Sequence, residues 1–259
     1  MCTVAVTNIC KVYPGHSASD ESVHALDGIT FRVENQEFCS ILGHSGCGKT
    51  TLLTLMAGLE QPTSGEILVD GEPVGKPSWQ RTVIFQDYAL FPWMTVAENV
   101  AFGLEMKKIA APERNDIVAR NIRLVGLSGF EHRYPHQLSG GMKQRVSIAR
   151  ALAVDPEVLL MDEPFGALDA QNRSRMQEEL GRLLAQEDLR DKTMVLVTHS
   201  IEESILLSDR IIVLTRRPGR VKADIQVKLP RPRDESDAGF IALKHQIRDL
   251  IHDEFEIEA

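Results

Sequence analysis

The sequence contains no apolar run long enough to cross a membrane. None of its 259 residues lies in a stretch that approaches the ~18 consecutive apolar residues of a spanning helix. The opening segment, MCTVAVTNICKVYPG, also lacks the basic stretch and the following apolar run of a secretory signal. Internal repeats and low-complexity tracts are absent, which excludes a collagenous or largely disordered chain. We therefore expect a cytosolic globular protein with one sizeable core.

Cysteine is scarce, and basic residues are outnumbered by acidic ones. The four cysteines, at positions 2, 10, 39 and 47, have no C-x-x-C spacing and no paired histidine, which disfavours a zinc site or a disulfide framework. We expect reduced thiols packed in or near strands. Lys and Arg total 29 against 37 Asp and Glu, for a formal charge of -8. This deficit of positive charge disfavours a nucleic-acid partner held by bulk electrostatics.

The apolar pattern predicts an α/β chain. Alternation predicts strands near the N-terminus, and short apolar runs separated by helical patterns are typical of a parallel sheet covered on both faces. The expected strands include 38–42, 67–69, 82–85, 158–161, 194–197, 211–214 and 221–229, and the expected helices include 49–59, 170–186, 200–207 and 240–257. The stretch 95–153 is predicted to be helical, with a capping box at Thr95 and Glu98 and with Pro112 in a first helical turn.

A glycine-rich motif carries the sharpest chemical signal. Gly43-His-Ser-Gly-Cys-Gly48-Lys49-Thr50 fits G-x-x-x-x-G-K-[ST] between a predicted strand and a predicted helix. Such glycines allow backbone N–H groups to surround phosphate oxygens, and the helix N-terminus adds positive potential. Lys49 would reach the terminal phosphates, and the Thr50 hydroxyl would bind Mg²⁺. The alternative is a glycine turn that only packs a helix on a sheet.

A second motif supplies carboxylates. The apolar run 158–161 predicts a buried strand that delivers Asp162 to the edge of the sheet, with Glu163 next in the loop. Asp162 is interpreted as a Mg²⁺ ligand acting through water, and Glu163 as the group that polarises the attacking water. The alternative, that both residues cap a turn before Pro164, loses weight beside a phosphate loop.

A third motif is a second predicted anion site. Ser139 is a good helix N-cap, and Gly140 and Gly141 after it expose backbone N–H groups at the start of a helix. A helical region separates this site from the phosphate loop, so we do not expect it to reach the same γ-phosphate. The pattern predicts a dimer in which the loop 138–142 of each chain closes the nucleotide of the other.

With these motifs the sequence resembles the ATP-binding-cassette (ABC) ATPases over nearly its whole length. The marks of the family stand in order: the phosphate loop 43–51, the Q-loop glutamine Gln86, the signature 138–142, the Walker B residues Asp162 and Glu163, the D-loop 167–169 and the switch histidine His199. Met142 replaces the usual glutamine of the signature, but the serine and both glycines remain.

The resemblance implies a fold and a domain organisation. The fold is an α/β P-loop NTPase of the ABC type, with a parallel core sheet, an N-terminal antiparallel β subdomain and a helical subdomain. The implied single domain, 1–259, has its core in 1–87 and 154–230, its helical subdomain in 88–153 and a C-terminal helical tail in 231–259. We expect the tail helix to pack on its own core, with a dimer contact as the alternative, and we expect no regulatory β-domain after it.

The resemblance also implies ATP and Mg²⁺ as cofactors and assigns residues to them. Nucleotide binding is implied for Tyr13, Gly43, His44, Ser45, Gly46, Cys47, Gly48, Lys49, Thr50, Thr51, Ser139, Gly140, Gly141 and Asp169. Metal binding is implied for Thr50, Gln86 and Asp162, and catalysis for Glu163, His199 and Gln86. Tyr13 would stack on adenine, although an aromatic on a strand face is the alternative. Cys47 inside the loop predicts sensitivity to thiol alkylation.

Within the family, the segments 85–94 and 161–170 resemble importer ATPases. The segment 215–220 most resembles the importers for nitrate, taurine and aliphatic sulfonates, a group that also includes bicarbonate and some vitamin-precursor systems. Tyr88, Phe91 and Trp93 are candidates for the groove where a permease docks, with internal packing an equal alternative. The trio Arg216, Arg217 and Arg220 is interpreted as a solvated turn without a ligand.

The implied function is the energy-coupling subunit of an importer, in which ATP-driven closure of a dimer powers transport through separate permease chains. The second ATPase chain would be an identical copy or a close paralogue, and a solute-binding protein would be an indirect partner. The implied location is the cytoplasmic face of the inner or plasma membrane. A cassette protein of ribosomes or DNA is disfavoured by the single cassette and the acidic charge, and a lipid-handling or export ATPase is a weaker alternative.

Overall fold

The computed structural model describes residues 2–15, 22–166, 177, 180–182 and 191–252. The chain forms two compact units. The first unit combines residues 1–78 with 191–259, and the second comprises residues 79–190. In the described ranges no helix is long and apolar enough to span a membrane, and the four cysteines form no disulfide.

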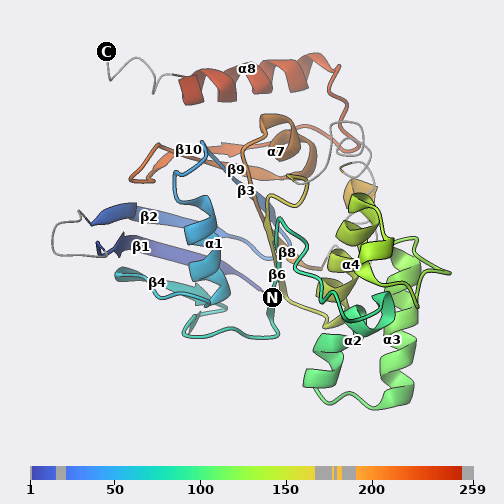
Figure 1. Cartoon of the computed structure of the whole chain (residues 1–259). Coiled ribbons are helices and arrows are strands. Elements are labelled where there is room, and N and C mark those ends of the chain that lie inside the picture. Colours follow the sequence, from blue (N-terminus) through green and yellow to red (C-terminus); the bar gives the residue numbers. More distant parts are fainter. Residues whose placement is uncertain (1, 16–21, 167–176, 178–179, 183–190, 253–259) are drawn as a thin grey trace. The chain divides into compact units, whose positions relative to one another are not determined.

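The first unit contains an antiparallel sheet near the N-terminus. Its strands are β1 (Val4–Tyr13), β2 (Val23–Val33), β4 (Ser64–Val69) and β5 (Glu72–Pro73), in the order β2-β1-β4-β5 (Figure 1). The alternation predicted from the sequence is visible in β1, where Val4 and Val6 are buried and Ala5 between them is half-buried. The antiparallel β subdomain is therefore confirmed.

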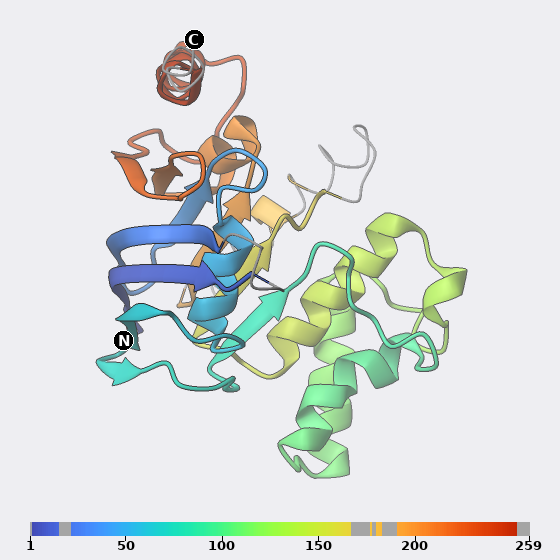
Figure 2. The same ribbon diagram turned by 60° about the vertical axis from the view of Figure 1, so that its left-hand side comes forward.

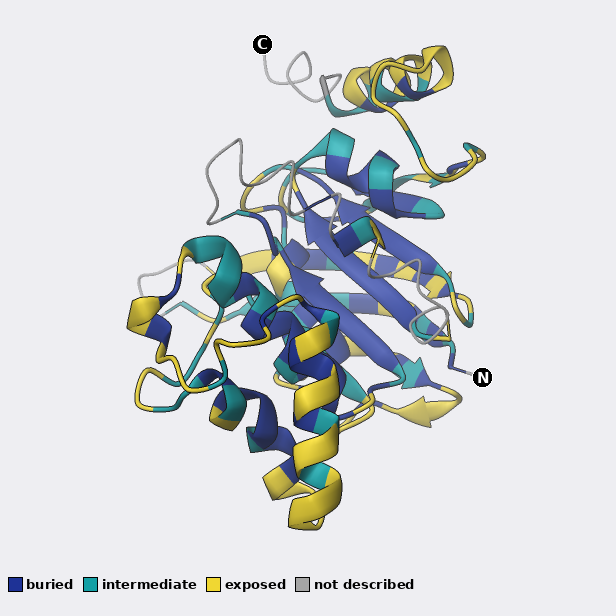
Figure 3. Cartoon of the chain, turned by 90° about the vertical axis from the view of Figure 1, so that its right-hand side faces the viewer, coloured by how far each residue is buried: buried dark blue, intermediate teal, exposed yellow. Residues whose placement is uncertain are grey.

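The same unit contains a largely parallel set of strands. They are β3 (Phe38–Leu42), β8 (Thr193–Thr198), β9 (Arg210–Leu214) and β10 (Val221–Gln226), in the order β10-β9-β3-β8. Strand β3 runs parallel to both β8 and β9, and only β10 is antiparallel to its neighbour. All residues of β3 and β8 are buried, as expected for a sheet covered on both faces (Figure 3).

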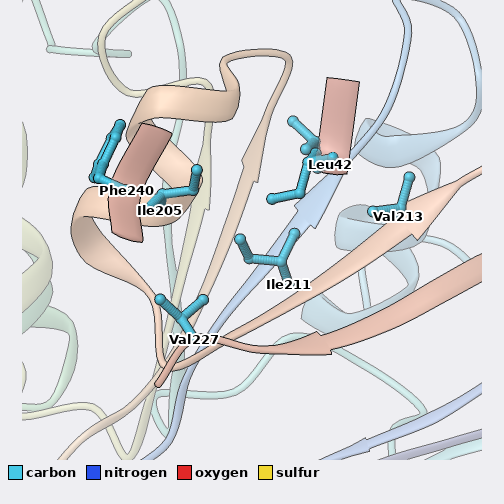
Figure 4. Close-up of a cluster of buried hydrophobic side chains, with 7 residues drawn as sticks. Leu42, Ile205, Ile211, Val213, Val227 and Phe240 are labelled. Atoms are coloured by element: carbon cyan, nitrogen blue, oxygen red, sulfur yellow. The ribbon is translucent and has the colours of Figure 1, made fainter. Parts of the chain in front are cut away.

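Three helices belong to this unit: α1 (Lys49–Ala57), α7 (Ile201–Leu207) and α8 (Ala238–His252). Helix α8 packs on the core of its own unit, which confirms the prediction for the tail helix. Phe240 and Ile247 are buried in one cluster with Ile205 of α7 and with residues of β3 and β9 (Figure 4). The guanidinium of Arg233 secures the connection before α8, because it donates to the carbonyls of Ile205, Ser208 and Leu229.

The second unit joins two parallel strands to a group of helices (Figure 2). Its elements are β6 (Arg81–Ile84), α2 (Val96–Met106), α3 (Ala111–Leu124), the 3-10 helix η1 (Pro135–Gln137), α4 (Gly140–Ala153) and β7 (Val158–Asp162). The predicted capping box is present, since Thr95 and Glu98 bond reciprocally at the start of α2. Pro112 lies in the first turn of α3, as predicted.

Some predicted boundaries were wrong. Helix α1 ends at Ala57 rather than at residue 59, because Gly58 adopts a φ of 76° and closes the helix. Strand β10 ends at Gln226 rather than at residue 229, because Gln226 pairs with Arg210, the first residue of β9, and no partner strand continues. Most of the predicted helix 170–186 lies outside the described residues, although Gln177 and Leu180 within it are helical and buried.

Candidate nucleotide site

The phosphate-loop motif forms the predicted strand–loop–helix connection. Strand β3 ends at Leu42, and α1 begins at Lys49. Gly48 between them has a φ of 101°, and a Cβ on it would lie 2.7 Å from Cδ2 of Leu26 and 2.8 Å from the carbonyl oxygen of Ala25. Only glycine fits this position. The N-cap residue of α1 is Gly48, which has no side chain to cap the helix, as in helix starts that bind anions.

Lys49 places a buried positive charge inside this loop. Its side chain is 5% exposed, and Nζ donates to the carbonyl oxygens of Gly43 and His44, both at 2.9 Å. A buried ammonium requires such acceptors. Cys47 is also fully buried, with its thiol beside Gly43. This burial predicts slow attack on Cys47 by alkylating agents, contrary to the expectation from the sequence.

His199 follows a strand that neighbours the phosphate loop. Leu42 of β3 pairs with Thr198 of the parallel strand β8, so Gly43 and His199 both come one residue later at the same edge of the sheet. His199 is exposed there. The structure thus brings His199 and the phosphate loop to one edge, as the predicted γ-phosphate contact requires.

The residues flanking His199 are fixed by a carboxylate that the sequence reading missed. Glu203, which is 4% exposed, accepts a hydrogen bond of 2.5 Å from the hydroxyl of Thr198. Ser200 caps α7 by accepting from the backbone N–H of Glu203 at 3.2 Å. The spacing Ser200-x-x-Glu203 matches a capping box and could have signalled this residue. His199 is therefore held between two anchored neighbours.

Tyr13 is the last residue of β1 and is half-buried. Its hydroxyl donates to the carboxylate of Glu60 at 2.8 Å, and Nζ of Lys11 lies 4.9 Å from the centroid of its ring. Burial raises the pKa of Tyr13, and a hydrogen bond with the side chain of Thr51 acts in the opposite direction. The ring therefore lies near the start of α1, with Lys11 over it.

In the second unit, predicted metal-binding and catalytic residues lie at the C-terminal ends of two neighbouring strands. Strands β6 and β7 are parallel, with Ile84 opposite Met161, so Gln86 and Asp162 follow at the same edge. Asp162 is 7% exposed, and Glu163 has a φ of 42°. A positive φ at a non-glycine residue is strained backbone, and strain of this kind concentrates at functional sites. A Cβ on Gly166 would lie 2.9 Å from Nε2 of Gln86, so the glutamine amide lies against the loop that carries Glu163.

The signature forms the predicted helix start. Ser139 caps α4, and its hydroxyl accepts from the N–H of Met142 at 3.3 Å. Gly141 faces open space, with no atom within 4 Å of a Cβ placed on it. The N-terminus of α4 is accessible, as a contact with the nucleotide of another chain requires. Asp169 and the rest of the D-loop, residues 167–169, lie outside the described residues.

The aromatic cluster of the second unit divides into a packed and an exposed part. Phe91 packs on Phe102, with ring centroids 4.5 Å apart, and Asn99 fixes its backbone through hydrogen bonds to both its N–H and its carbonyl. Arg150 donates to the carbonyls of Tyr88 and Ala89. Trp93 stays 69% exposed at the end of this rigid loop. An exposed tryptophan on a fixed loop is typical of an interaction site.

The first unit thus groups the phosphate loop, His199 and Tyr13, and the second unit groups Gln86, Asp162 and Glu163. The glycine-built cradle, the buried ammonium and the uncapped helix start fit a bound triphosphate. The hydroxyl of Thr50 and the carboxylate of Asp162 are hard oxygen donors that suit Mg²⁺.

Comparison with known proteins decides the family. The family model of the ABC transporters matches residues 26–166, more than half of the chain. The chain belongs to the ABC transporter family. It is therefore an ABC ATPase, which binds ATP and hydrolyses it to ADP and phosphate.

Several relatives of this ABC ATPase are similar over most of its length. ABC transporter ATP-binding protein MJ0412 of Methanocaldococcus jannaschii is 49% identical over 96% of this chain and 91% of the relative. Aliphatic sulfonates import ATP-binding protein SsuB of Bacillus cereus is 43% identical over 98% of this chain and 96% of SsuB. Bicarbonate transport ATP-binding protein CmpC of Synechococcus elongatus is 48% identical over 90% of this chain, which spans only 35% of CmpC.

The solved structures agree with this assignment. The ATP-binding cassette MJ0796, in a dimeric post-hydrolysis state bound to ADP and Pi, is similar with a TM-score of 0.74 and 32% identity. The match covers 88% of this chain and 100% of that chain. The predicted ABC fold, with its mixed parallel core, antiparallel β subdomain and helices, is confirmed.

Proposed function

We propose that this ABC ATPase powers the import of a small anion of the bicarbonate, nitrate or sulfonate type through separate permease subunits. The observation that carries this proposal is the similarity to SsuB over nearly the whole of both chains, together with 48% identity to CmpC. The chain would act as a single ATPase domain, with its core in 1–87 and 154–230, its helical subdomain in 88–153 and its tail in 231–259. A solute-binding protein outside the membrane would deliver the anion.

We propose the following division of labour at the nucleotide. Residues 43–51 would hold the triphosphate, with the Lys49 ammonium on its terminal phosphates, and the Tyr13 ring would stack on adenine. Thr50, Asp162 and Gln86 would hold Mg²⁺, which neutralises phosphate charge and orients the terminal phosphoryl group when bound. Glu163 would accept a proton from the attacking water, and His199 would keep that water and the γ-phosphate in place.

The active assembly would be a dimer of this chain or of this chain with a close paralogue. The similar cassette MJ0796 is dimeric, and the accessible start of α4 suits a contact with the nucleotide of a partner. Ser139, Gly140 and Gly141 would supply that contact, and Asp169 would support the phosphate loop of the opposing chain. ATP would then hold the two chains together until hydrolysis releases them.

The assembly would sit at the cytoplasmic face of the membrane, with the permease at the loop that carries Tyr88, Phe91 and Trp93. Phe91 is internally packed, so the exposed Trp93 would supply the main contact. A buried tryptophan at an interface is commonly an affinity-determining residue.

Uptake measurements test this function. Right-side-out proteoliposomes that contain the permease, with this chain and ATP inside and the binding protein outside, should accumulate labelled bicarbonate, nitrate or an alkanesulfonate in an ATP-dependent manner. Trp93→Ala should weaken permease association by about tenfold and abolish uptake, while the isolated chain keeps its ATPase rate. Trp79→Ala is the matched control, because Trp79 is also exposed, at 47%. ATP-dependent efflux, or no movement of any of the three anions, would contradict the proposal.

A further inference from the structure

The turn between β9 and β10, residues 215–220, is a closed structure. The N–H of Thr215 donates to the carbonyl of Arg220 at 2.9 Å, and the N–H of Arg220 donates back to the hydroxyl of Thr215 at 2.9 Å. The hydroxyl of Thr215 also donates to the carbonyl of Pro218 at 3.1 Å. Because its ends are hydrogen-bonded to each other, the turn has a defined conformation and can hold the residues that it contacts in place.

One side of this turn is anchored to β2. The N–H of Gly219 donates to the carbonyl of Ala25, and the N–H of Asp27 donates to the carbonyl of Gly219, both at 3.0 Å. The guanidinium of Arg220 donates to the carboxylate of Asp27, with Nε at 2.9 Å, and this bond lowers the pKa of Asp27. Since the same part of β2 also lies against Gly48, the turn and the phosphate loop share one support.

The other side of the turn contacts the phosphate loop itself. Nε and Nη2 of Arg217 both donate to the carbonyl oxygen of Gly46, each at 3.1 Å. A Cβ on Gly219 would lie 2.3 Å from the carbonyl oxygen of Cys47, so the turn fits directly against the next peptide as well. The solvated turn predicted from the sequence is correct in that Arg217 and Arg220 are exposed, but both guanidinium groups have partners inside the unit.

These contacts fix the direction of a peptide group. The peptide that joins Gly46 to Cys47 is planar, so holding its carbonyl also fixes the direction of the Cys47 N–H, which donates to the carbonyl of His44 within the loop at 3.3 Å. A bond from a charged guanidinium is stronger than one between neutral groups. A loop whose backbone is already ordered binds an anion without the cost of ordering it.

We propose that the turn 215–220 braces the phosphate loop from outside, with Arg217 as a positioning residue for nucleotide binding. The proposal rests on the proposed role of residues 43–51 in holding the triphosphate. Arg217 acts through the carbonyl of Gly46 rather than on the nucleotide. Its loss should therefore loosen the loop whether or not nucleotide is bound.

The test uses Arg217→Ala, Arg217→Lys and a control, Arg32→Ala. Arg32 is an exposed arginine of β2 whose guanidinium pairs with the neighbouring Glu34 at 3.1 Å. The first measurement is the rate at which N-ethylmaleimide modifies Cys47 without nucleotide, followed by peptide mapping. Cys47 is fully buried in the braced loop, so Arg217→Ala should speed its modification by about five- to tenfold. Arg32→Ala should leave the rate unchanged.

The second measurement is ATPase kinetics. Arg217→Ala should raise KM for ATP by about five- to tenfold and leave kcat within about twofold, because the brace acts on binding. Arg217→Lys keeps the charge without the planar fork and should give intermediate values for both measurements. It also carries the test if the alanine variant fails to fold.

Unchanged modification of Cys47 in Arg217→Ala would overturn the proposal, even if KM rises, because Arg217 would then act directly on the nucleotide. Faster modification together with a raised KM supports it. Faster modification in the control as well would overturn it, since the effect would not be specific to the brace. A vesicle assay without uptake of any anion would contradict the proposed transport function and leave the result on Cys47 standing.

Discussion

At the residue scale, Tyr13 links the antiparallel sheet to the nucleotide site. Its hydroxyl is bonded to Glu60, and Lys11 lies over its ring. Stacking on adenine needs a ring face, whereas the bond to Glu60 needs only the hydroxyl. The proposed stacking role of the ring can therefore be separated from the hydroxyl contact by substitution.

Tyr13→Ala should weaken ATP binding by about tenfold, the scale of the loss of one base-stacking contact. Tyr13→Phe keeps the ring and should bind ATP within about twofold of the wild type. Isothermal titration measures both affinities, with inorganic tripolyphosphate as the control ligand, because it has no base. If the phenylalanine variant lost as much affinity as the alanine variant, the hydroxyl rather than the ring would be the group that matters.

The position of Glu163 after a buried strand was predictable from sequence, but its backbone geometry was not. The run of apolar residues before Asp162 predicts a buried strand, and β7 is fully buried. The positive φ of Glu163 has no signal in the sequence, since it depends on the turn that closes from the N–H of Gly166 to the carbonyl of Glu163. Local patterns predict which residues lie at the edge of a sheet, whereas their backbone conformation depends on the turn that follows the strand.

At the scale of elements, helix α8 is part of the core of the first unit. Phe240 is 1% exposed and packs with Ile205 and Val227, whereas Ile241 beside it is 43% exposed. Neighbouring positions of one helix therefore offer a matched comparison of a buried and an exposed side chain.

Phe240→Ala should lower the free energy of unfolding by about 3–5 kcal/mol, because it leaves a cavity between α8 and α7. Ile241→Ala should change it by less than about 1 kcal/mol, since the side chain is already largely in water. Urea unfolding followed by tryptophan fluorescence and circular dichroism gives both values. Equal losses for the two variants would mean that the outer face of α8 is buried in solution, as in the alternative of a dimer contact.

Most elements were predictable because their signals are local. The apolar period located the strands, and the caps at Thr95 and Ser139 located the starts of α2 and α4. The contact between Arg217 and Gly46 was not predictable, because the two residues are 171 positions apart and nothing in the spacing shows that the turn folds back on the loop. The carboxylate of Glu203 could have been found, because its capping spacing from Ser200 is local, but that pattern was not used in the prediction.

At the scale of the whole molecule, the chain has two compact units that carry different sets of functional side chains. The first carries the phosphate loop, a buried ammonium and His199, which suit binding of a triphosphate. The second carries Asp162, Glu163 and Gln86, which suit metal binding and activation of water. Binding and hydrolysis should therefore be separable by one substitution in each unit.

The central claim is that residues 43–51 bind ATP and that Glu163 activates the water that hydrolyses it, in a dimer of ATPase chains. The most direct test measures ATP affinity, turnover and molar mass by light scattering for Glu163→Gln, with Lys49→Ala as the comparison. Glu163→Gln should bind ATP within about twofold of the wild type, lose at least about 100-fold in kcat and remain a dimer with Mg²⁺ and ATP. Lys49→Ala should bind ATP weakly and stay monomeric. A Glu163→Gln variant that hydrolyses ATP at the wild-type rate, or stays monomeric with ATP, would contradict the account.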